Sequence, residues 1–194
     1  QQEIIHLLGE IVESRSKETA YHVIRVAEYI ELIGKAAGHP PEEIKLIKAA
    51  SPMHDVGKMA IPDAILLKPG KLTVEEFAIM KTHADIGHKI LSASRRRLLK
   101  MAADIAYTHH ERWDGKGYPR SLSGNEIHIF GRIVAVADVF DALSHDRCYK
   151  KAWPMERVVD LFRSESARHF DPDLIDIFLS NVDAFQEIND RFPA

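Results

Sequence analysis

The sequence predicts an all-α fold, and three observations support this. Apolar side chains recur every three or four residues through most of the chain, as they do on the buried face of a helix. The β-prone run Ile133–Val136 is part of a longer segment with helical spacing, and we find no convincing strand elsewhere. The chain has 194 residues, of which 45% are hydrophobic, and this is enough for a single domain with a sizeable core.

Residues 4–12 place their apolar side chains on one helical stripe, which comprises Ile4, Ile5, Leu8, Ile11 and Val12. We expect residues 1–16 to be a connector helix that enters from an upstream regulatory domain missing from this chain. Such a connector could also form the seam of a homodimer. The alternative is that this stripe belongs to a first core helix. Because the chain begins with Gln-Gln rather than Met, we expect it to be a piece of a longer polypeptide.

A second helix is expected over residues 17–37, with Val23, Val26, Ile30 and Ile33 facing inward. Gly38 and the prolines that follow it end this helix, and Pro41-Glu42-Glu43 opens the next one with acidic residues in its first turn. We expect that helix to run into Met53-His54-Asp55, where Gly57 breaks it. Residues 56–72 then form a connection.

The second half of the chain continues the helical pattern. Thr73 and Glu76 have the spacing of a capping box, which begins a helix that carries Phe77, Met80 and His83. A helix over residues 97–110 ends at a histidine pair, and residues 113–119 form a loop because they contain two glycines and a proline. An apolar helix over 131–143 carries Asp138. Pro154 and Asp171-Pro172 mark the starts of two closing helices.

Composition narrows the classes of function. The net charge of −3 gives no reason to expect a nucleic acid polymer as partner. The single cysteine, Cys148, excludes an internal disulfide framework and fits a reducing cytoplasm. No apolar stretch approaches the ~20 residues of a membrane span, and no signal peptide is visible. We therefore expect a cytoplasmic protein, or the cytoplasmic domain of a larger signalling protein.

Potential metal ligands are the most informative feature of the chain, and they comprise the His54-Asp55 doublet, His83, the His109-His110 doublet and Asp138. Neighbouring residues on a helix point about 100° apart, so a doublet suits two adjacent ions better than one. A carboxylate such as that of Asp55 can bridge two ions, which lie roughly 3.5–4 Å apart in hydrolytic sites. Asp138 interrupts an apolar run, where a buried charge needs a partner.

Two earlier residues could extend this set of ligands. His22 is the natural seventh ligand, and Glu18 lies four residues before it on the same helical face. Taken alone, such a histidine is more often a surface or core residue, and such a glutamate is usually solvated. The remaining histidines have no ligand-like neighbours and are expected to be bystanders: His6, His39, His88, His128, His145 and His169.

The motifs resemble those of the HD-GYP domain, a branch of the HD superfamily of metal-dependent phosphohydrolases. The resemblance covers about residues 15–180, and we assign the domain to residues 17–194. The matching stretches are His54–Lys58, Ile65–Thr73, His109–Pro119, Ala137–Leu143 and His169–Pro172. The resemblance implies a single helical HD-type domain with a multinuclear metal site between its helices.

The same resemblance implies the activity. A member of this family would hydrolyse cyclic di-GMP, a bacterial second messenger, to pGpG and/or GMP through a hydroxide that bridges two metal ions. Iron or manganese would be the usual metal, with two or three ions bound. The implied ligands are Glu18, for a third ion, and His22, His54, Asp55, His83, His109, His110 and Asp138.

Asp55 and Lys58 are the implied catalytic residues, and Lys58, Arg147 and Lys150 are the implied contacts to the substrate. Arg147 and Lys150 are three residues apart, so both can face one pocket. The motif loop Gly117-Tyr118-Pro119 could shape the mouth of the pocket. In this family it could also dock a diguanylate cyclase (GGDEF) domain.

The chain departs from the family pattern at Ala20-Tyr21, at Ser121 and at His145, and these departures bear on pocket shape and substrate preference. Two alternative functions remain open. One is an HD-type hydrolase of another cyclic dinucleotide or of a nucleotide monophosphate. The other is a receptor that binds cyclic di-GMP without hydrolysing it, although no implied ligand is lost from the sequence.

Overall fold

The computed structural model describes residues 9, 11–12, 15, 20–146 and 151–193. Over this part of the chain the α-helices are α2 (Ala20–Ala36), α3 (Pro41–Ala50), α4 (Asp63–Leu66), α5 (Val74–Ser92), α6 (Arg97–Thr108), α7 (Ile129–Ser144), α8 (Met155–Ser164), α9 (Pro172–Ser180) and α10 (Val182–Arg191). Short 3-10 helices are η1 (Ser51–Met53), η2 (Val56–Ala60) and η3 (Gly124–Glu126). The described residues contain isolated β-bridges but no strand, which confirms the all-α prediction.

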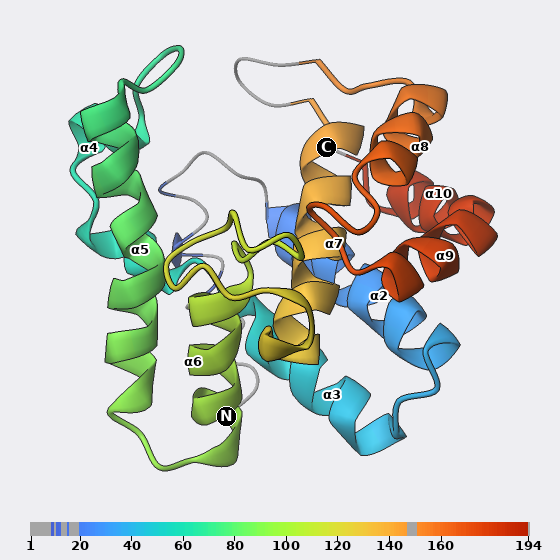
Figure 1. Ribbon diagram of the computed structural model, residues 1–194, viewed down its shortest axis with the longest axis horizontal. Coiled ribbons are helices and arrows are strands. Elements are labelled where there is room, and N and C mark those ends of the chain that lie inside the picture. The colour runs from blue at the N-terminus through green and yellow to red at the C-terminus, as the bar shows by residue number, and fades with distance from the viewer. Residues whose placement is uncertain (1–8, 10, 13–14, 16–19, 147–150, 194) are drawn as a thin grey trace.

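Helix α7 is the centre of the fold. In Figure 1 it runs through the middle of the view, with α5 and α6 on the left and α8, α9 and α10 on the right. Its side chains Ile133, Val134, Val136 and Phe140 are fully buried. The Phe140 ring centroid lies 5.0 Å from that of Phe185 on α10, so α7 joins the two sides of the molecule.

Helix α2 packs along α7 and supplies the inward face that its sequence predicts. Val23, Val26, Ile30 and Ile33 are all buried. Tyr29 adds an edge-to-face contact with Phe140, with ring centroids 4.9 Å apart. The apolar stripe of one helix therefore fixes α2 against the element that carries Asp138.

Helix α3 ends earlier than the sequence analysis expected. It stops at Ala50 and the chain continues as the 3-10 turn η1, so His54 and Asp55 do not lie on an α-helix. The cause is Pro52, which has no N–H to donate to the carbonyl one turn before it. The Ser51 hydroxyl donates to the Lys48 carbonyl instead, at 3.2 Å.

The expected connection over residues 56–72 contains the short elements η2 and α4. Gly57 lies inside η2 and allows this element to press against α5. A Cβ at position 57 would lie 1.9 Å from the His83 carbonyl oxygen and 2.7 Å from the Gly87 nitrogen. Gly57 is therefore required for close packing, and the expectation that it breaks a helix was wrong.

The predicted helix starts in the second half are largely confirmed. The Thr73 hydroxyl accepts from the Glu76 N–H at 3.2 Å, and the Glu76 carboxylate accepts from the Thr73 N–H at 2.7 Å. Helix α7 begins two residues before the expected position, where His128 Nδ1 accepts from the Phe130 N–H at 3.2 Å. The closing region contains α8, α9 and also α10, which begins at Val182 without a proline or glycine to mark it.

The loop after the histidine pair is held closed by one buried carboxylate. Glu111 accepts from the N–H of Arg120 at 2.7 Å and from the N–H of Leu122 at 3.0 Å. The Trp113 N–H also donates to the His169 carbonyl oxygen at 3.1 Å. The loop is therefore fixed both to itself and to the segment between α8 and α9.

Most of the expected connector over residues 1–16 lies outside the described residues. Val12 is buried, whereas Ile11 is exposed, so these two members of the expected stripe face different surroundings. The Arg15 guanidinium donates to the carbonyls of Lys58, Met59 and Ile61 in or next to η2. The division of the chain at residue 16 stays a prediction.

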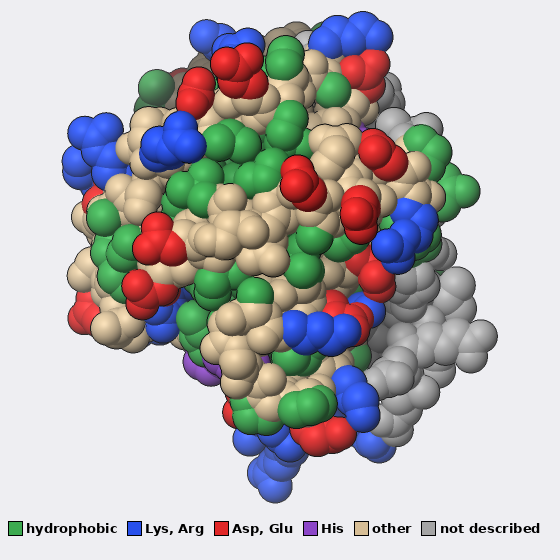
Figure 2. Space-filling view, turned by 90° about the vertical axis from the view of Figure 1, so that its right-hand side faces the viewer, with side chains coloured by type: hydrophobic (Ala, Val, Ile, Leu, Met, Phe, Trp, Pro, Cys, Tyr) green, Lys and Arg blue, Asp and Glu red, His purple; other side chains and the backbone are tan. Residues whose placement is uncertain are grey.

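Charge is mixed on the side of the molecule where α8, α9 and α10 lie. Figure 2 shows acidic and basic side chains interspersed on this face, with apolar side chains between them. Across the part of the chain that the structure describes, no helix has both the length and the apolar character that a bilayer crossing demands.

Gly57→Ala tests the packing of η2 on α5. The added methyl group collides with backbone atoms of α5, so we expect unfolding free energy to fall by on the order of 1–3 kcal/mol. Chemical denaturation measures this loss. Gly34→Ala is the matched control, because the nearest neighbours of its Cβ would be side-chain atoms of Ile44, at 3.0 Å and beyond, and not the backbone of another helix. Equal losses in the two variants would contradict the argument.

His169→Gln tests a pH dependence. Burial lowers the pKa of His169 to about 4, so the folded protein disfavours its protonated form. The unfolded chain takes up this proton near pH ~6.5, so the stabilising contribution of neutral His169 is present above that pH. It is lost as the pH falls toward about 4.

Urea denaturation at pH 7 and pH 5 measures this contribution. The wild type should lose on the order of 1–2 kcal/mol more than His169→Gln between the two conditions. An identical loss in both proteins would show that His169 is not the group responsible.

Candidate metal centre

The His54-Asp55 doublet lies in the turn between η1 and η2, and both side chains are buried. Close packing of η2 on α5 brings Asp55 to His83, and packing of α5 on α6 adds His109. Asp55 Oδ1 lies 3.2 Å from His83 Nε2 and 3.7 Å from His109 Nε2. Three segments that are distant in sequence therefore meet at one carboxylate.

The predicted ligand residues that are described fall into two compact groups. The first contains Asp55, His83, His109 and His110, and the second contains His22, His54 and Asp138. Within each group the potential ligand atoms all lie within 4.8 Å of one another. Helices α2 and α7 supply the second group, together with the turn that carries the doublet.

Asp55 lies between the two groups. Its Oδ1 faces the histidines of the first group, whereas its Oδ2 lies 3.2 Å from His54 Nε2. A carboxylate that bridges two ions needs its two oxygens to face separate sets of ligands. The positions of the two oxygens are compatible with the bridging role expected of Asp55, which stays a prediction.

Hydrogen bonds at Nδ1 orient the imidazole rings. His54 Nδ1 lies 2.8 Å from the Ser51 carbonyl oxygen, and His83 Nδ1 lies 2.7 Å from that of Met80. His109 Nδ1 lies 3.1 Å from the carbonyls of Ile105 and Ala106. A carbonyl can only accept, so each ring carries its proton on Nδ1 and directs the Nε2 lone pair inward, as a metal ligand requires.

Buried atoms without hydrogen bonds also fit a metal centre. Among the described residues, Asp55 Oδ1, His83 Nε2 and His109 Nε2 are buried and form no hydrogen bond. A buried polar atom without a hydrogen bond lowers the stability of the fold, so three such atoms that face one another indicate a missing partner. Coordination of divalent ions would satisfy them, so the residues present fit the metals that the sequence implies.

The protonation states suit ligation. Burial opposes ionisation of Asp55, but the pKa of the carboxyl is held well below its usual range, and the Lys58 ammonium is the largest influence that lowers it. Burial also lowers the pKa of His109. The pKa of His110 is lowered further, by burial and by the neighbouring His109. Metal ligands must be deprotonated, and these groups are so at neutral pH.

Lys58 and Tyr118 complete the immediate surroundings. Lys58 Nζ lies 2.5 Å from Asp55 Oδ2, so this predicted substrate contact is placed directly at the centre. The Tyr118 ring stacks on His110 with centroids 4.7 Å apart and also lies edge-on to Phe77. The motif loop therefore contributes a wall of the first group.

Some predicted site residues lie outside the described part of the chain, and one is more exposed than expected. Glu18, Arg147 and Lys150 lie outside the described residues. Asp138 was expected to be buried within its apolar run, but its side chain is 21% exposed, because it faces His22 at the edge of the helix packing. Its Oδ1 lies 3.7 Å from His22 Nε2.

Sequence reasoning assigned no role to Asp141 and Arg25. Asp141 is buried, lies 2.7 Å from His22 Nδ1 and accepts from Arg25 Nε at 2.6 Å. Burial raises the pKa of Asp141, but the hydrogen bonds from His22 and Arg25 lower it to about 2. His145, expected to be a bystander, contacts this carboxylate at 3.4 Å. The available signal was a second aspartate one turn after Asp138.

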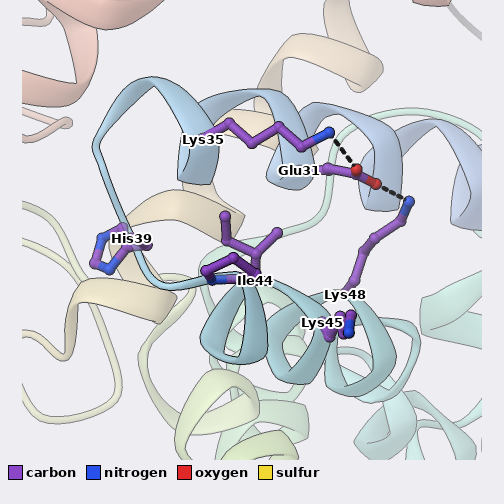
Figure 3. A pocket seen from close by; sticks show the side chains of 7 residues that line it. Glu31, Lys35, His39, Ile44, Lys45 and Lys48 are labelled. Atoms are coloured by element: carbon purple, nitrogen blue, oxygen red, sulfur yellow. Dashed lines mark hydrogen bonds and ion pairs between the residues drawn. The ribbon is translucent and has the colours of Figure 1, made fainter.

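A pocket of about 570 Å³ between α2 and α3 (Figure 3) involves none of these residues. Its lining includes Lys35 and Lys48, and both are paired with Glu31. Lys48 also contacts Glu28 at 2.7 Å. Lys45, which also lines the pocket, pairs with Glu42 at 3.0 Å, so each lysine of this lining has an acidic partner.

Comparison with known proteins gives a consistent result. A model of the HD domain family matches residues 6–174. The chain is 49% identical over 191 residues to the 3'3'-cGAMP-specific phosphodiesterase 2 of Vibrio cholerae, covering 98% of this chain and 37% of that protein. It is 42% identical over 192 residues to the cyclic di-GMP phosphodiesterase response regulator RpfG of Xanthomonas campestris, covering 99% and 51%. A cyclic di-GMP phosphodiesterase of Thermotoga maritima is 46% identical over 177 residues, covering 91% and 48%.

Solved structures show the same fold. A cyclic GMP-AMP specific phosphodiesterase from V. cholerae matches with a TM-score of 0.71 at 17% identity, covering 100% of this chain and 54% of the other. An HDG"Y"P protein from Bdellovibrio bacteriovorus matches with a TM-score of 0.65 at 17% identity, covering 84% and 51%. The chain spans about half or less of the length of these proteins. By the family match and these relatives, the chain belongs to the HD domain family, as its resemblance to the HD-GYP branch led us to expect.

Proposed function

We propose that this chain is a metal-dependent phosphodiesterase that hydrolyses cyclic di-GMP to pGpG and/or GMP. The observation that carries the proposal is the position of Asp55, whose two oxygens face two separate groups of ligand side chains. Relatives named as cyclic di-GMP phosphodiesterases support the substrate. We propose iron or manganese as the metal, with two ions held by the described residues and Glu18 available for a third.

A second candidate substrate is 3'3'-cGAMP. The relative with 49% identity over 98% of the chain is named as specific for that dinucleotide. Both molecules are cyclic dinucleotides with two phosphodiesters, so the same centre could act on either one. Assays of the two substrates side by side, with detection of linear products, would decide between them.

The chain's own residues would organise the reaction. His22, His54 and Asp138 would hold one ion, and His83, His109 and His110 the other, with Asp55 shared between them. Divalent ions at these positions would lower the pKa of water toward ~7 and neutralise charge on the phosphoryl oxygens. The Nδ1 hydrogen bonds keep the rings fixed, so the centre needs little rearrangement during the reaction.

Lys58 would provide positive charge beside the substrate. Its ammonium lies at Asp55 Oδ2, close enough to contact a phosphate bound at the same carboxylate. We propose that Arg147 and Lys150 contact the second phosphate, as the family resemblance implies. Tyr118 stacks on His110, so its ring would form part of the pocket wall.

Docking of a diguanylate cyclase domain on the motif loop stays a proposal, and the same holds for a homodimer. Because Tyr118 contacts a proposed ligand, replacing it would disturb the metal centre as well as any docking. Lys116 is exposed in the same loop and offers a cleaner test. If Lys116→Glu leaves binding of such a domain unchanged, the loop is not the docking surface.

Asp55→Ala tests the bridging role. Loss of the shared carboxylate should lower kcat by about 10³-fold or more and should also reduce the bound metal. Elemental analysis and product detection from cyclic di-GMP measure the two effects. Asp85→Ala, an exposed aspartate two residues from His83 on α5, is the control and should retain both properties. Unchanged turnover in Asp55→Ala would refute the proposed centre.

Lys58→Ala separates substrate binding from metal binding. Removing the ammonium should lower kcat/KM by roughly 10–100-fold, because one charge contact to the phosphate is lost, while the metal content stays unchanged. Lys45→Ala removes an exposed lysine on α3 and should have no effect. Loss of metal from Lys58→Ala would mean that Lys58 stabilises the ligands rather than the substrate.

A further inference from the structure

The orientation of His22 differs in origin from that of His54, His83 and His109. His54, His83 and His109 are held at Nδ1 by backbone carbonyls three or four residues earlier, which any sequence would supply. His22 Nδ1 is held by a side chain from another helix, Asp141 on α7, at 2.7 Å. The identity of a residue on a distant helix therefore contributes to the orientation of His22.

The contact is part of a paired arrangement between two helices. His22 and Arg25 are one turn apart on α2, and Asp138 and Asp141 are one turn apart on α7. The first members face each other, with His22 Nε2 3.7 Å from Asp138 Oδ1. The second members form a buried ion pair, in which Arg25 donates to Asp141 at 2.6 Å and 3.0 Å.

We propose that Asp141 is a positioning residue for one half of the metal centre, the group of His22, His54 and Asp138. The proposal rests on the proposed metal centre. Asp141 accepts the Nδ1 proton of His22, which fixes the tautomer and directs Nε2 toward Asp138. Arg25 holds the Asp141 carboxylate in place through two hydrogen bonds, and its Nη1 donates to the Phe192 carbonyl at 3.0 Å, beyond the end of α10.

Burial explains why both partners are needed. His22, Arg25 and Asp141 are each at most 2% exposed. A carboxylate at this depth is costly unless it is paired and hydrogen-bonded, and Arg25 supplies the charge and two donors. A carboxylate partner also makes an imidazole a stronger ligand than a carbonyl partner does. The ion pair with Arg25 therefore stabilises the Asp141 carboxylate as the hydrogen-bond acceptor of His22 Nδ1.

The arrangement predicts a selective effect. Asp141 touches neither His83 nor His109, whose rings are held within their own helices. Loss of Asp141 should therefore weaken the ion at the His22 group and spare the ion at the His83 group. A role in general stability would weaken both ions together or neither of them.

The test uses the 194-residue chain and titration with Mn²⁺, followed by calorimetry and elemental analysis. Asp141→Asn should weaken one of two Mn²⁺ sites by about 10–100-fold and leave the other within about threefold. Asp171→Asn is the matched control. Asp171 is also buried and paired with an α7 arginine, Arg132, at 2.5 Å, but it contacts no proposed ligand. It should leave both sites unchanged.

A second readout does not need metal. Nitrogen-15 NMR of the chelator-treated protein reports the tautomer of His22, which should be protonated at Nδ1 in the wild type and in Asp171→Asn. In Asp141→Asn, His22 should populate both the Nδ1-protonated and the Nε2-protonated tautomers. If Asp141→Asn does not fold, the double variant Arg25→Met with Asp141→Leu removes the pair without leaving a buried charge, and the same two results are expected.

Wild-type affinity at both sites together with an unchanged His22 tautomer would overturn the proposal, and so would equal weakening of both sites. A wild-type chain that binds no Mn²⁺ would count against the proposed function instead. In that case an unchanged tautomer in Asp141→Asn would still overturn the positioning role.

Discussion

The structure depends on one buried carboxylate that several helices approach at once. Asp55 lies on a turn that is neither α-helix nor exposed loop, with histidines from α5 and α6 at one oxygen and His54 at the other. A charge at this depth is stable only with close partners, and here the partners are the Lys58 ammonium and the histidines that we propose as ligands. The packing of η2, α5 and α6 is thus tied to the chemistry of a single residue.

The two halves of the centre are built by different physical means. Around His83 and His109 the rings are oriented within their own helices, so the positions of α5 and α6 are sufficient. Around His22 the orientation comes from a pairing between α2 and α7, in which each helix contributes one proposed ligand and one residue of the buried Arg25–Asp141 pair. The rings of His83 and His109 are thus oriented by local backbone, whereas the ring of His22 is oriented by a contact between helices.

Much of this could be predicted from the sequence, because periodicity and caps act locally. The inward face of α2 and the capping box at Thr73 followed from residue types and spacing, and the set of candidate ligands followed from the two doublets together with the family resemblance. What the sequence did not reveal depends on contacts between distant elements. The role of Gly57 requires knowing that α5 lies against it, and the role of Asp141 requires knowing that α2 faces α7. Helix α10 begins after Asn181, a residue type favoured at N-caps, but it lacks the proline that marked the starts of α8 and α9, and its start was missed.

The central claim is that Asp55 is shared by two metal ions. Anomalous diffraction from crystals of this chain grown with Mn²⁺, recorded near the manganese absorption edge, tests it directly. The account predicts two peaks on either side of the Asp55 carboxylate, roughly 3.5–4 Å apart, one near His22 and the other near His83. A single peak beside Asp55, or peaks confined to other parts of the surface, would contradict it.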